Sequence, residues 1–232
     1  MTWRFRLFLL MAIALTMTPL AFMTGCQELP TEGETSVISD ELPDASPSAQ
    51  SSPMTWPSSI QDFKLPYDGI RDACGGQIWK VVCGYGCGYH HNTNYMAAAY
   101  HSIDLVRQDA PTTHSAVLAP ARGIVSFVGW RNGYGWCVEM DHRNGWKSLV
   151  AHLETDPWEF VHTYDDLRQG TFLGYAGNSG ASTTPHIHFS VWRNNVTHTL
   201  DGVSLINPRL NGRYNSGNDY VAPPTGNPNP IP

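Results

Sequence analysis

Positive charge is scarce in this chain of 232 residues, which has 14 Lys and Arg against 20 Asp and Glu and a formal net charge of −6. Six of the acids lie between residues 27 and 59, where there is no Lys or Arg. From residue 61 onward the balance is nearly even, at 12 basic and 14 acidic side chains. Since a basic patch is the electrostatic mark of nucleic-acid binding, we expect no nucleic acid as a partner.

Helical periodicity is also scarce, and two common catalytic motifs are missing. There is no His-Glu-x-x-His, the motif of helical zinc proteases. Residues 177–180 are Gly-Asn-Ser-Gly, which is not the Gly-x-Ser-x-Gly elbow of serine hydrolases. Glycine, aromatic and β-branched residues are plentiful instead, and turn signals recur. The sequence therefore predicts an all-β, mainly antiparallel domain whose long loops form the walls of a groove.

A long apolar run lies near the N-terminus, from Leu7 to Met23, after two arginines. A basic start, an apolar middle and small residues at the cleavage point are typical of a secretory signal. Residues 23–26, Met-Thr-Gly-Cys, resemble the lipobox of bacterial lipoproteins, in which Cys26 becomes the lipidated first residue. An uncleaved N-terminal anchor is the alternative. With either, we expect the rest of the chain to lie outside the cytoplasm, in the cell envelope, and a lipid would anchor it to a bacterial membrane without spanning it.

Composition divides the chain into four segments. Residues 1–26 are the predicted signal segment, and residues 27–60 are rich in Ser, Pro and acids. Because this second segment has too few large apolar side chains for a core, it is predicted to be a disordered tether. Residues 61–220 suffice for one domain of ordinary size. The Pro-rich residues 221–232 form a predicted unstructured tail.

Cysteine is rare, and apart from Cys26 the chain has Cys74, Cys83, Cys87 and Cys137. An even number in an exported domain predicts two disulfides, and the sequence leaves three pairings open. The alternative is that Cys83 and Cys87 bind a metal ion. Disulfides are the preferred interpretation, because the chain has no second Cys pair at ligand spacing.

Alternation of apolar and polar residues predicts the strands. Around residues 101–106, Ile103 and Leu105 point inward, whereas Asp104 points outward. Further strands are predicted near residues 116–118, 123–130 and 170–176.

Asn144-Gly145 between two alternating runs is typical of a two-residue type I′ hairpin turn. Counting outward from this turn predicts a buried face of three pairs: Met140 with Leu149, Val138 with Ala151, and Trp136 with Leu153. The opposite, open face then carries Cys137, Glu139, Val150 and His152.

Two histidines, His186 and His188, lie two positions apart in another alternating run. The opposite side of that predicted strand carries Ile187, Phe189 and Val191. Residues i and i+2 of a strand share a face and lie about 7 Å apart.

With Asp104 and His152, these imidazoles are the nitrogen and oxygen donors that zinc binds in a tetrahedron with one position left for water. Surface histidines on an edge strand are the alternative. A cupin barrel is disfavoured, because no Glu follows in residues 189–196.

A third protein ligand has three candidates: His90, His91 and His101. His101 lies three residues from Asp104 on the same predicted strand, which puts it on the opposite face. His90 and His91 follow the glycine-rich residues 84–89. Neighbouring side chains of an extended segment diverge, so we expect one of these two to bind the metal.

The order of these segments resembles the lysostaphin-type family of zinc endopeptidases, which includes the β-lytic proteases. Residues 102–105, Ser-Ile-Asp-Leu, resemble its Asp-bearing strand, and residues 150–153 resemble its Tyr-x-His-Leu element. Its Gly-Asn-Ser-Gly loop and its Ser-Thr-Gly-Pro-His-Leu-His-Phe signature are matched at residues 177–180 and 182–189. The resemblance runs from about residue 89 to 191 and implies a single lysostaphin-type β-sheet or β-sandwich domain. Thr184 replaces a usual Gly and Val150 a usual Tyr, and both substitutions would alter the substrate groove.

The resemblance also implies a Zn²⁺ ion held by Asp104, by His188 and by an upstream histidine. In the β-lytic branch that histidine lies well before the Asp, and His91, 13 residues before Asp104, fits this spacing best, with His90 as the second choice. Four further residues take implied roles: His152 and His186 as catalytic histidines that do not bind the metal, and Asn178 and Thr184 in the substrate groove.

The implied reaction is hydrolysis of peptide bonds in peptidoglycan, in stem or cross-link peptides, by a water molecule that the metal activates. We expect the chain to act as a monomer. The alternative is a non-hydrolytic protein of the same fold that binds peptidoglycan or activates another enzyme.

Overall fold

Nine strands pair into one antiparallel sheet in the computed structural model, which describes residues 55–69, 77–91, 99–203, 209–214, 216 and 218. All of these residues belong to one unit of the chain, residues 39–232. The elements, in chain order, are η1 (Ile60–Asp62), β1 (Trp79–Cys83), η2 (Gly88–His91), β2 (Ile103–Arg107), β3 (Ala116–Leu118), β4 (Gly123–Arg131), β5 (Gly135–Asp141), β6 (Trp146–Leu153), η3 (Pro157–Glu159), β7 (Asp166–Leu167), β8 (Phe172–Tyr175), β9 (Ile187–Arg193), β10 (Val196–Thr197) and β11 (Arg213–Tyr214).

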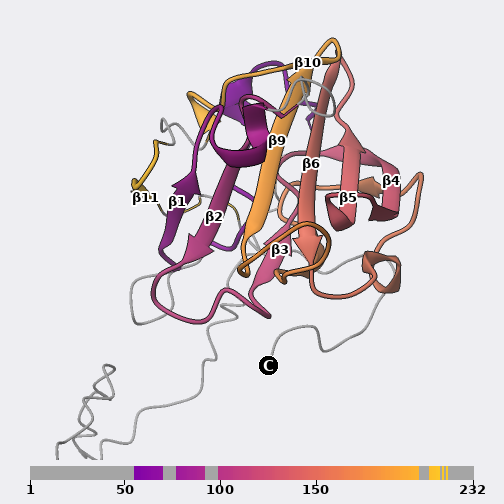
Figure 1. Ribbon diagram of the computed structural model, residues 1–232. Helices are drawn as coiled ribbons and strands as arrows, with labels where there is room; N and C mark the ends of the chain where they lie inside the picture. The colour runs from indigo at the N-terminus through magenta and orange to yellow at the C-terminus, as the bar shows by residue number, and fades with distance from the viewer. Residues whose placement is uncertain are drawn as a thin grey trace, which may run out of the picture. The chain divides into compact units, whose positions relative to one another are not determined.

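The main sheet has the strand order β11-β1-β2-β9-β6-β5-β4-β7, and β10 pairs with β9. Strands β3 and β8 form a separate two-stranded sheet. Figure 1 shows β2, β9 and β6 side by side at the centre of the main sheet. The predicted all-β, antiparallel fold is confirmed, and the strands expected near residues 116–118, 123–130 and 170–176 correspond to β3, β4 and β8.

The alternating pattern of the two central strands decides which side chains enter the core. In β2, Ile103 and Leu105 are fully buried. In β9, the apolar residues Ile187, Phe189 and Val191 are buried in the same core. Their polar neighbours therefore lie on the opposite face, as predicted. The register of the β2–β9 pair sets Asp104 directly opposite His188.

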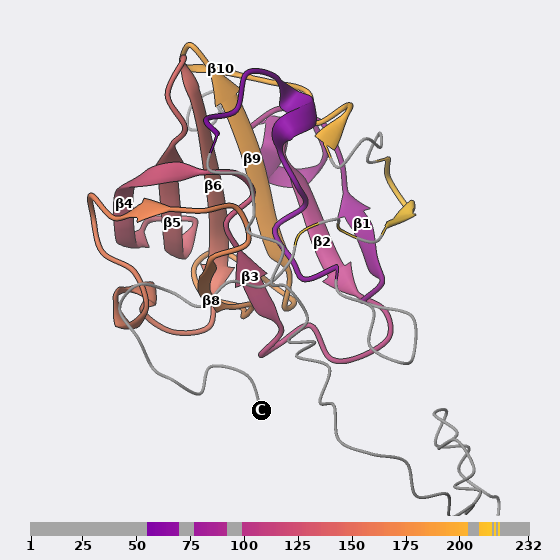
Figure 2. The same cartoon turned by 180° about the vertical axis from the view of Figure 1, so that it is seen from behind.

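The core face of the sheet is covered by residues 63–67 and by the small sheet of β3 and β8 (Figure 2). The Lys64 amide donates to the Pro120 carbonyl at 2.7 Å, and the Leu118 amide donates to the Pro66 carbonyl at 3.0 Å. The Tyr67 ring stacks on Trp79 with the ring centres 4.9 Å apart. With that side closed by protein, the opposite face of β2, β9 and β6 is the one left for a site.

The hairpin between β5 and β6 differs from the prediction. Its loop has three residues, 143–145, which all adopt positive φ angles of 65°, 49° and 80°. The Arg143 amide donates to Asp141 Oδ1 at 2.8 Å, which supports this wider turn. The extra loop residue shifts the pairing by one, so that Glu139 lies opposite Leu149. The predicted faces were therefore wrong for three residues: Val150 joins the main core, whereas Leu149 and Ala151 lie in a smaller cluster with Cys137.

A β-bulge in β6 restores the predicted pairing of Trp136 with Leu153. Between this pair and the pair of Val138 with Val150, β6 has one residue more than β5. His152 lies in the bulge with a φ of 63°, and its amide donates to the Tyr134 carbonyl at 2.9 Å. His152 thus reaches the open face by a bulge and not by regular alternation. Bulges redirect side chains in this way next to active sites.

The described cysteines confirm one disulfide, between Cys83 and Cys87. The prediction of two disulfides was wrong for Cys137, which is a free thiol, because β5 buries it completely in the smaller cluster. Cys74 and Cys26 lie outside the described residues, as do the predicted signal segment, most of the tether and the tail. Within the described part of the chain, no helix has the length and apolar character needed to cross a membrane.

Candidate metal centre

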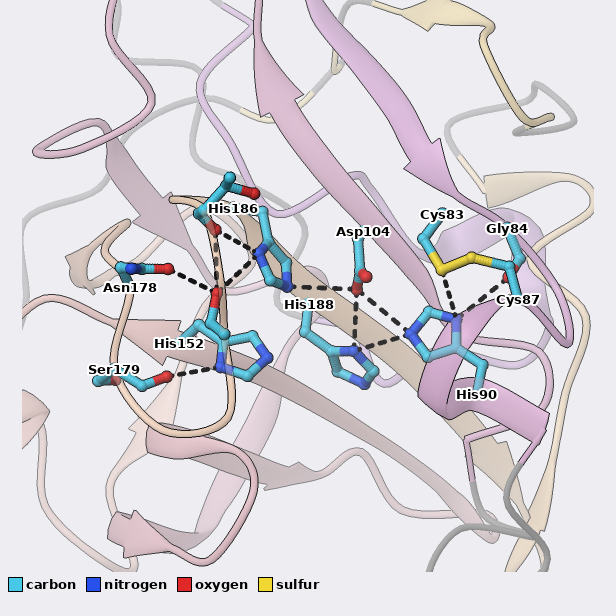
Figure 3. Close-up of polar contacts among 12 residues, drawn as sticks. Cys83, Gly84, Cys87, His90, Asp104, His152, Asn178, Ser179, His186 and His188 are labelled. Atoms are coloured by element: carbon cyan, nitrogen blue, oxygen red, sulfur yellow. Dashed lines mark hydrogen bonds and ion pairs between the residues drawn. A yellow bond between two sulfur atoms is a disulfide. The ribbon is translucent and has the colours of Figure 1, made fainter.

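Three side chains from three elements converge on the open face of the sheet: His90 from η2, Asp104 from β2 and His188 from β9 (Figure 3). His90 Nε2 lies 3.3 Å from Asp104 Oδ1 and 3.2 Å from His188 Nδ1. The third side of the triangle, from His188 Nδ1 to Asp104 Oδ1, is 3.1 Å. Ligand atoms bound to tetrahedral zinc at about 2.0–2.1 Å lie roughly 3.3 Å from one another. The three atoms are therefore spaced like three corners of a zinc tetrahedron.

Hydrogen bonds decide which ring nitrogens face this triangle. His90 Nδ1–H donates to the Gly84 carbonyl at 3.1 Å, so Nε2 is the nitrogen free to bind a cation. His188 has Nδ1 in the triangle, and its buried Nε2 has no hydrogen-bond partner among the residues that the structure describes. Two imidazole nitrogens and one carboxylate oxygen are donors that zinc prefers. The residues present therefore fit a zinc ion.

Burial and close contact fix the charges of the three side chains. Burial alone would raise the pKa of Asp104, but hydrogen bonds from His188 and His90 hold it well below its usual range, so the carboxylate is ionised. Burial lowers the pKa of His188. For His90, burial acts in the same direction, but the bond to Asp104 outweighs it and the pKa is raised. Asp104 thus draws positive charge to this point, as a metal-binding carboxylate must.

Two more histidine rings lie beside the triangle. His152 Nδ1–H donates to the Ser179 carbonyl at 2.8 Å, and His186 Nδ1–H donates to the Thr184 carbonyl at 2.8 Å. The ring centres of the two histidines are 4.5 Å apart. His186 Nε2 lies 3.6 Å from Asp104 Oδ1. Burial, helped by the neighbouring histidines, lowers the pKa of His152 to about 4, so its ring is neutral at pH 7.

All five of these side chains line one cavity of about 440 Å³. Its lining also includes residues 132–134 and 181–183, which are joined by the hydrogen bond from the Ala181 amide to the Gly133 carbonyl at 2.8 Å. None of the described residues that line it is Lys or Arg. An open cavity with ionised, neutral and hydrogen-bonding groups around three convergent donors is suited to metal-assisted hydrolysis.

A known protein family matches the part of the chain that carries these five side chains. Residues 88–200 match the profile of peptidase family M23. These residues form a peptidase family M23 domain. The resemblance to lysostaphin-type enzymes, first seen in the sequence motifs, is thereby confirmed.

Relatives of the M23 domain include the DD-carboxypeptidase/endopeptidase Mpg of Neisseria meningitidis serogroup B, which is 35% identical over 94 residues. The match covers 40% of this chain and 21% of Mpg, so the chain matches about a fifth of the length of this curated relative. The catalytic domain of lysostaphin from Staphylococcus simulans is 22% identical, over 53% of this chain and 86% of that chain, with a TM-score of 0.39. A zinc-containing peptidase from Vibrio cholerae is 18% identical, over 61% and 41% of the two chains, with a TM-score of 0.44.

The three histidines that the sequence left as candidates for the third ligand lie in different places in the M23 domain. His90 occupies the third corner of the triangle, whereas the side chain of His91 lies outside the described residues. His101 lies apart from the triangle, with Nδ1 2.6 Å from Thr197 Oγ1. The sequence comparison preferred His91, with His90 second, whereas His90 is the residue whose Nε2 lies in the triangle. Spacing along the chain separates the two poorly, because both lie in the single turn of η2.

Asn178 and Thr184, which were expected in the substrate groove, lie beside His186 and are not among the described residues that line the cavity. The Thr184 carbonyl accepts from His186. Asn178 Oδ1 accepts from Ser182 Oγ–H at 2.6 Å, and Ser182 Oγ lies 3.1 Å from His186 Nδ1. Val150 is buried in the core and does not reach the groove.

Sequence reasoning missed the role of Ser179. Its Oγ accepts from the Trp136 amide at 3.0 Å and donates to the Leu153 carbonyl at 2.6 Å. The Ser179 side chain thus ties its loop to both strands at the Trp136–Leu153 pair, at one end of the bulge, while its carbonyl orients His152. The Gly-Asn-Ser-Gly motif indicated the loop, but not the strands against which the loop folds.

Proposed function

We propose that this chain is a zinc-dependent endopeptidase that hydrolyses peptide bonds in peptidoglycan, in stem or cross-link peptides. The triangle of His90 Nε2, Asp104 Oδ1 and His188 Nδ1 carries the proposal, because its spacing fits a zinc tetrahedron with one corner left for water. The M23 domain and the endopeptidase named among its relatives support this substrate class.

Zinc bound to the triangle would polarise the scissile carbonyl and lower the pKa of a water molecule, so that hydroxide is available near neutral pH. His152 is neutral and donates its Nδ1–H to the Ser179 carbonyl, so its Nε2 is the ring nitrogen that would accept a proton from the attacking water. His186 is oriented in the same way by the Thr184 carbonyl, so its Nε2 faces Asp104 beside the triangle, where it would take part in proton transfer during the reaction. The walls at residues 132–134 and 181–183 bind the extended peptide and exclude bulk water.

The deciding experiment measures metal content and hydrolysis on the same sample. The purified full chain is analysed for zinc and incubated with purified peptidoglycan, and the released fragments are identified by mass spectrometry. We expect about one zinc per chain and new peptide ends. A zinc content near zero, together with intact peptidoglycan, would instead support the non-hydrolytic binding or activating protein.

We further propose that His90, and not His91, is the third protein ligand. The two residues are adjacent and chemically identical, so each is the matched control for the other. His90→Ala should remove most of the bound zinc, whereas His91→Ala should retain it. Zinc loss in His91→Ala with zinc retained in His90→Ala would reverse the assignment.

For the location of the enzyme, we propose a lipid anchor at Cys26, on the outer side of a bacterial membrane. The basic start, the apolar run and the Cys at the end of the signal-like segment support it. Such an anchor and the acidic segment after it would let the domain reach the wall. Fatty-acid labelling that persists in Cys26→Ala would rule out this lipidation site.

A further inference from the structure

A disulfide lies beside the imidazole of the candidate ligand His90, near Nδ1, the ring nitrogen that is not part of the triangle (Figure 3). It joins Cys83, the last residue of β1, to Cys87, which precedes η2. The two cysteines are four positions apart, so the bond closes a small ring of backbone around residues 84–86. His90 follows this ring by three residues.

Three contacts connect the ring to His90. The Gly84 carbonyl accepts from His90 Nδ1–H at 3.1 Å and thereby orients the imidazole. The Cys87 carbonyl accepts from the His90 amide at 2.8 Å and begins the single turn of η2. Cys83 Sγ lies 3.7 Å from His90 Nδ1. Both the backbone and the side chain of His90 are thus held by atoms of the disulfide-closed ring.

The other end of the ring is tied to the second candidate ligand. In the pairing of β1 with β2, Cys83 lies opposite Asp104. A covalent link from Cys83 to Cys87 therefore fixes the start of η2 relative to the strand position that carries Asp104. η2 has only four residues and belongs to no sheet, so its position relative to β2 depends on such links.

We propose that Cys83 and Cys87, joined as a disulfide, are positioning residues of the metal centre. They hold His90 Nε2 at the distance from Asp104 Oδ1 that a tetrahedral metal ion requires. This inference rests on the proposed function, because it takes His90 as a ligand. Loss of partners that orient a ligand typically lowers metal affinity by about 10- to 100-fold, and we expect a loss of this size without the disulfide.

The same sulfur atoms offer a competing role, because Cys83, Cys87 and His90 also form a group that could hold a metal ion if the thiols were reduced. The disulfide excludes thiolate ligands, and it suits the oxidising surroundings of an exported domain. The two roles predict different spectra, since only thiolates give a sulfur-to-metal charge-transfer band.

The test uses the full chain stripped of metal, with Co²⁺ as the probe. Affinity is measured by competition with a chelator, and the visible absorption of bound Co²⁺ reports its coordination geometry. The double variant Cys83→Ala/Cys87→Ala should bind Co²⁺ about 10- to 100-fold more weakly and show a weaker, altered visible spectrum. Cys137→Ala, which removes a sulfur atom that does not touch His90, should match the unmodified chain.

A double-mutant cycle shows whether the disulfide acts through His90. In a His90→Ala background, removing both cysteines should cause little further loss of Co²⁺ affinity.

If circular dichroism shows that the double variant has lost its sheet, the unmodified chain is titrated before and after reduction by a phosphine, which is oxidised as the disulfide becomes two thiols. Reduction should then weaken Co²⁺ binding.

Two results would overturn the inference. The first is an unchanged affinity and spectrum after loss or reduction of the disulfide. The second is a sulfur-to-cobalt band that accompanies binding, because it would make the sulfur atoms ligands and not positioning groups. Failure of the unmodified, oxidised chain to bind Co²⁺ at all would instead refute the proposed function, so the two failures are distinguishable.

Discussion

Asp104 and His188 face each other across the pair of β2 and β9, with 3.1 Å between Asp104 Oδ1 and His188 Nδ1. Two of the three candidate ligands are thus fixed by the register of two central strands. A slip of one residue would move either side chain to the opposite face of the sheet. The buried apolar residues of both strands oppose such a slip, so packing of the core also maintains the geometry of the candidate metal centre.

His188→Ala should lose both zinc and hydrolytic activity, because it removes one corner of the donor triangle. Metal analysis of the purified variant and a peptidoglycan digestion measure the two effects. His101→Ala is the control, since His101 binds Thr197 and lies apart from the triangle. If His101→Ala lost its zinc, the placement of His101 away from the ligands would be contradicted.

His186→Ala and His152→Ala should keep their zinc and lose activity by about 10²- to 10⁴-fold, the range expected for loss of a group that transfers a proton. Both rings lie beside the triangle without being part of it. The measurement is kcat for a defined peptide, with the zinc content of each variant checked in the same preparation. Loss of zinc in His186→Ala would make that residue a ligand.

Gly135 and Gly133 form a matched pair for testing the loop that orients His152. Both have a positive φ, at 65° and 84°. A Cβ atom on Gly135 would overlap Ser179 and the backbone of Gly180, whereas one on Gly133 would meet nothing within 4 Å. Gly133→Ala should therefore cost about 1 kcal/mol of unfolding free energy, from backbone conformation alone.

Gly135→Ala should cost more, because the Ser179 loop must move as well, and it should lower kcat by displacing the carbonyl that holds His152. Urea unfolding of the two variants measures the first effect, and peptide hydrolysis measures the second. Equal stabilities of the two variants would show that the close approach of Gly135 to Ser179 has no energetic importance.

His142 should make the fold sensitive to acid. Its side chain is fully buried, and burial lowers its pKa from 6.5 to about 4. The groups that face it are the Arg122 carbonyl, Ser148 Oγ and the Phe63 ring, with Asp141 as the nearby charge. Between pH 6.5 and 4 the unfolded chain binds a proton at this residue and the folded chain does not. The free energy of unfolding should therefore fall as the pH falls through this window, by roughly 3 kcal/mol in all.

The variant His142→Asn isolates this contribution. It should be less stable at pH 7, since the bonds to Arg122 and Ser148 are lost. Its stability should nevertheless fall less steeply between pH 6.5 and 4 than that of the unmodified chain. Urea unfolding at several pH values, with a chelator present throughout so that metal binding does not contribute, provides the comparison. Identical pH slopes for the two chains would contradict the depressed pKa.

The sequence predicted the parts of the site that obey a two-residue period. Ile103 and Leu105, and the apolar partners of His188, indicated which face each strand turns to the core, and this placed Asp104 and His188 each on an open face. That β2 and β9 are neighbours, with these two residues opposite each other, comes from the structure. His152 was assigned to the correct face for an incomplete reason, because a bulge with a positive φ does not show in an alternating pattern. The third residue of the turn at 143–145 was missed for the same reason. The backbone conformation there depends on a local hydrogen bond to Asp141, which an alternating pattern does not show.

The choice between His90 and His91 lay beyond pattern reasoning for a different reason. A single helical turn directs adjacent side chains by its orientation on the sheet, and that orientation comes from distant contacts such as the pairing of Cys83 with Asp104. Counting cysteines predicted disulfides, one of which is described, but it could not show that β5 would bury Cys137 as a free thiol.

The position of β9 between β2 and β6 has a consequence for the lifetime of a bound metal. A strand paired on both sides opens only when much of the fold opens, whereas η2 belongs to no sheet and, even with the disulfide that holds it, opens at a lower free-energy cost. Release of the ion should therefore begin at His90, with Asp104 and His188 still in place. The dissociation rate of the ion would be set by the local opening of η2, and the rest of the protein could remain folded while the ion leaves and binds again.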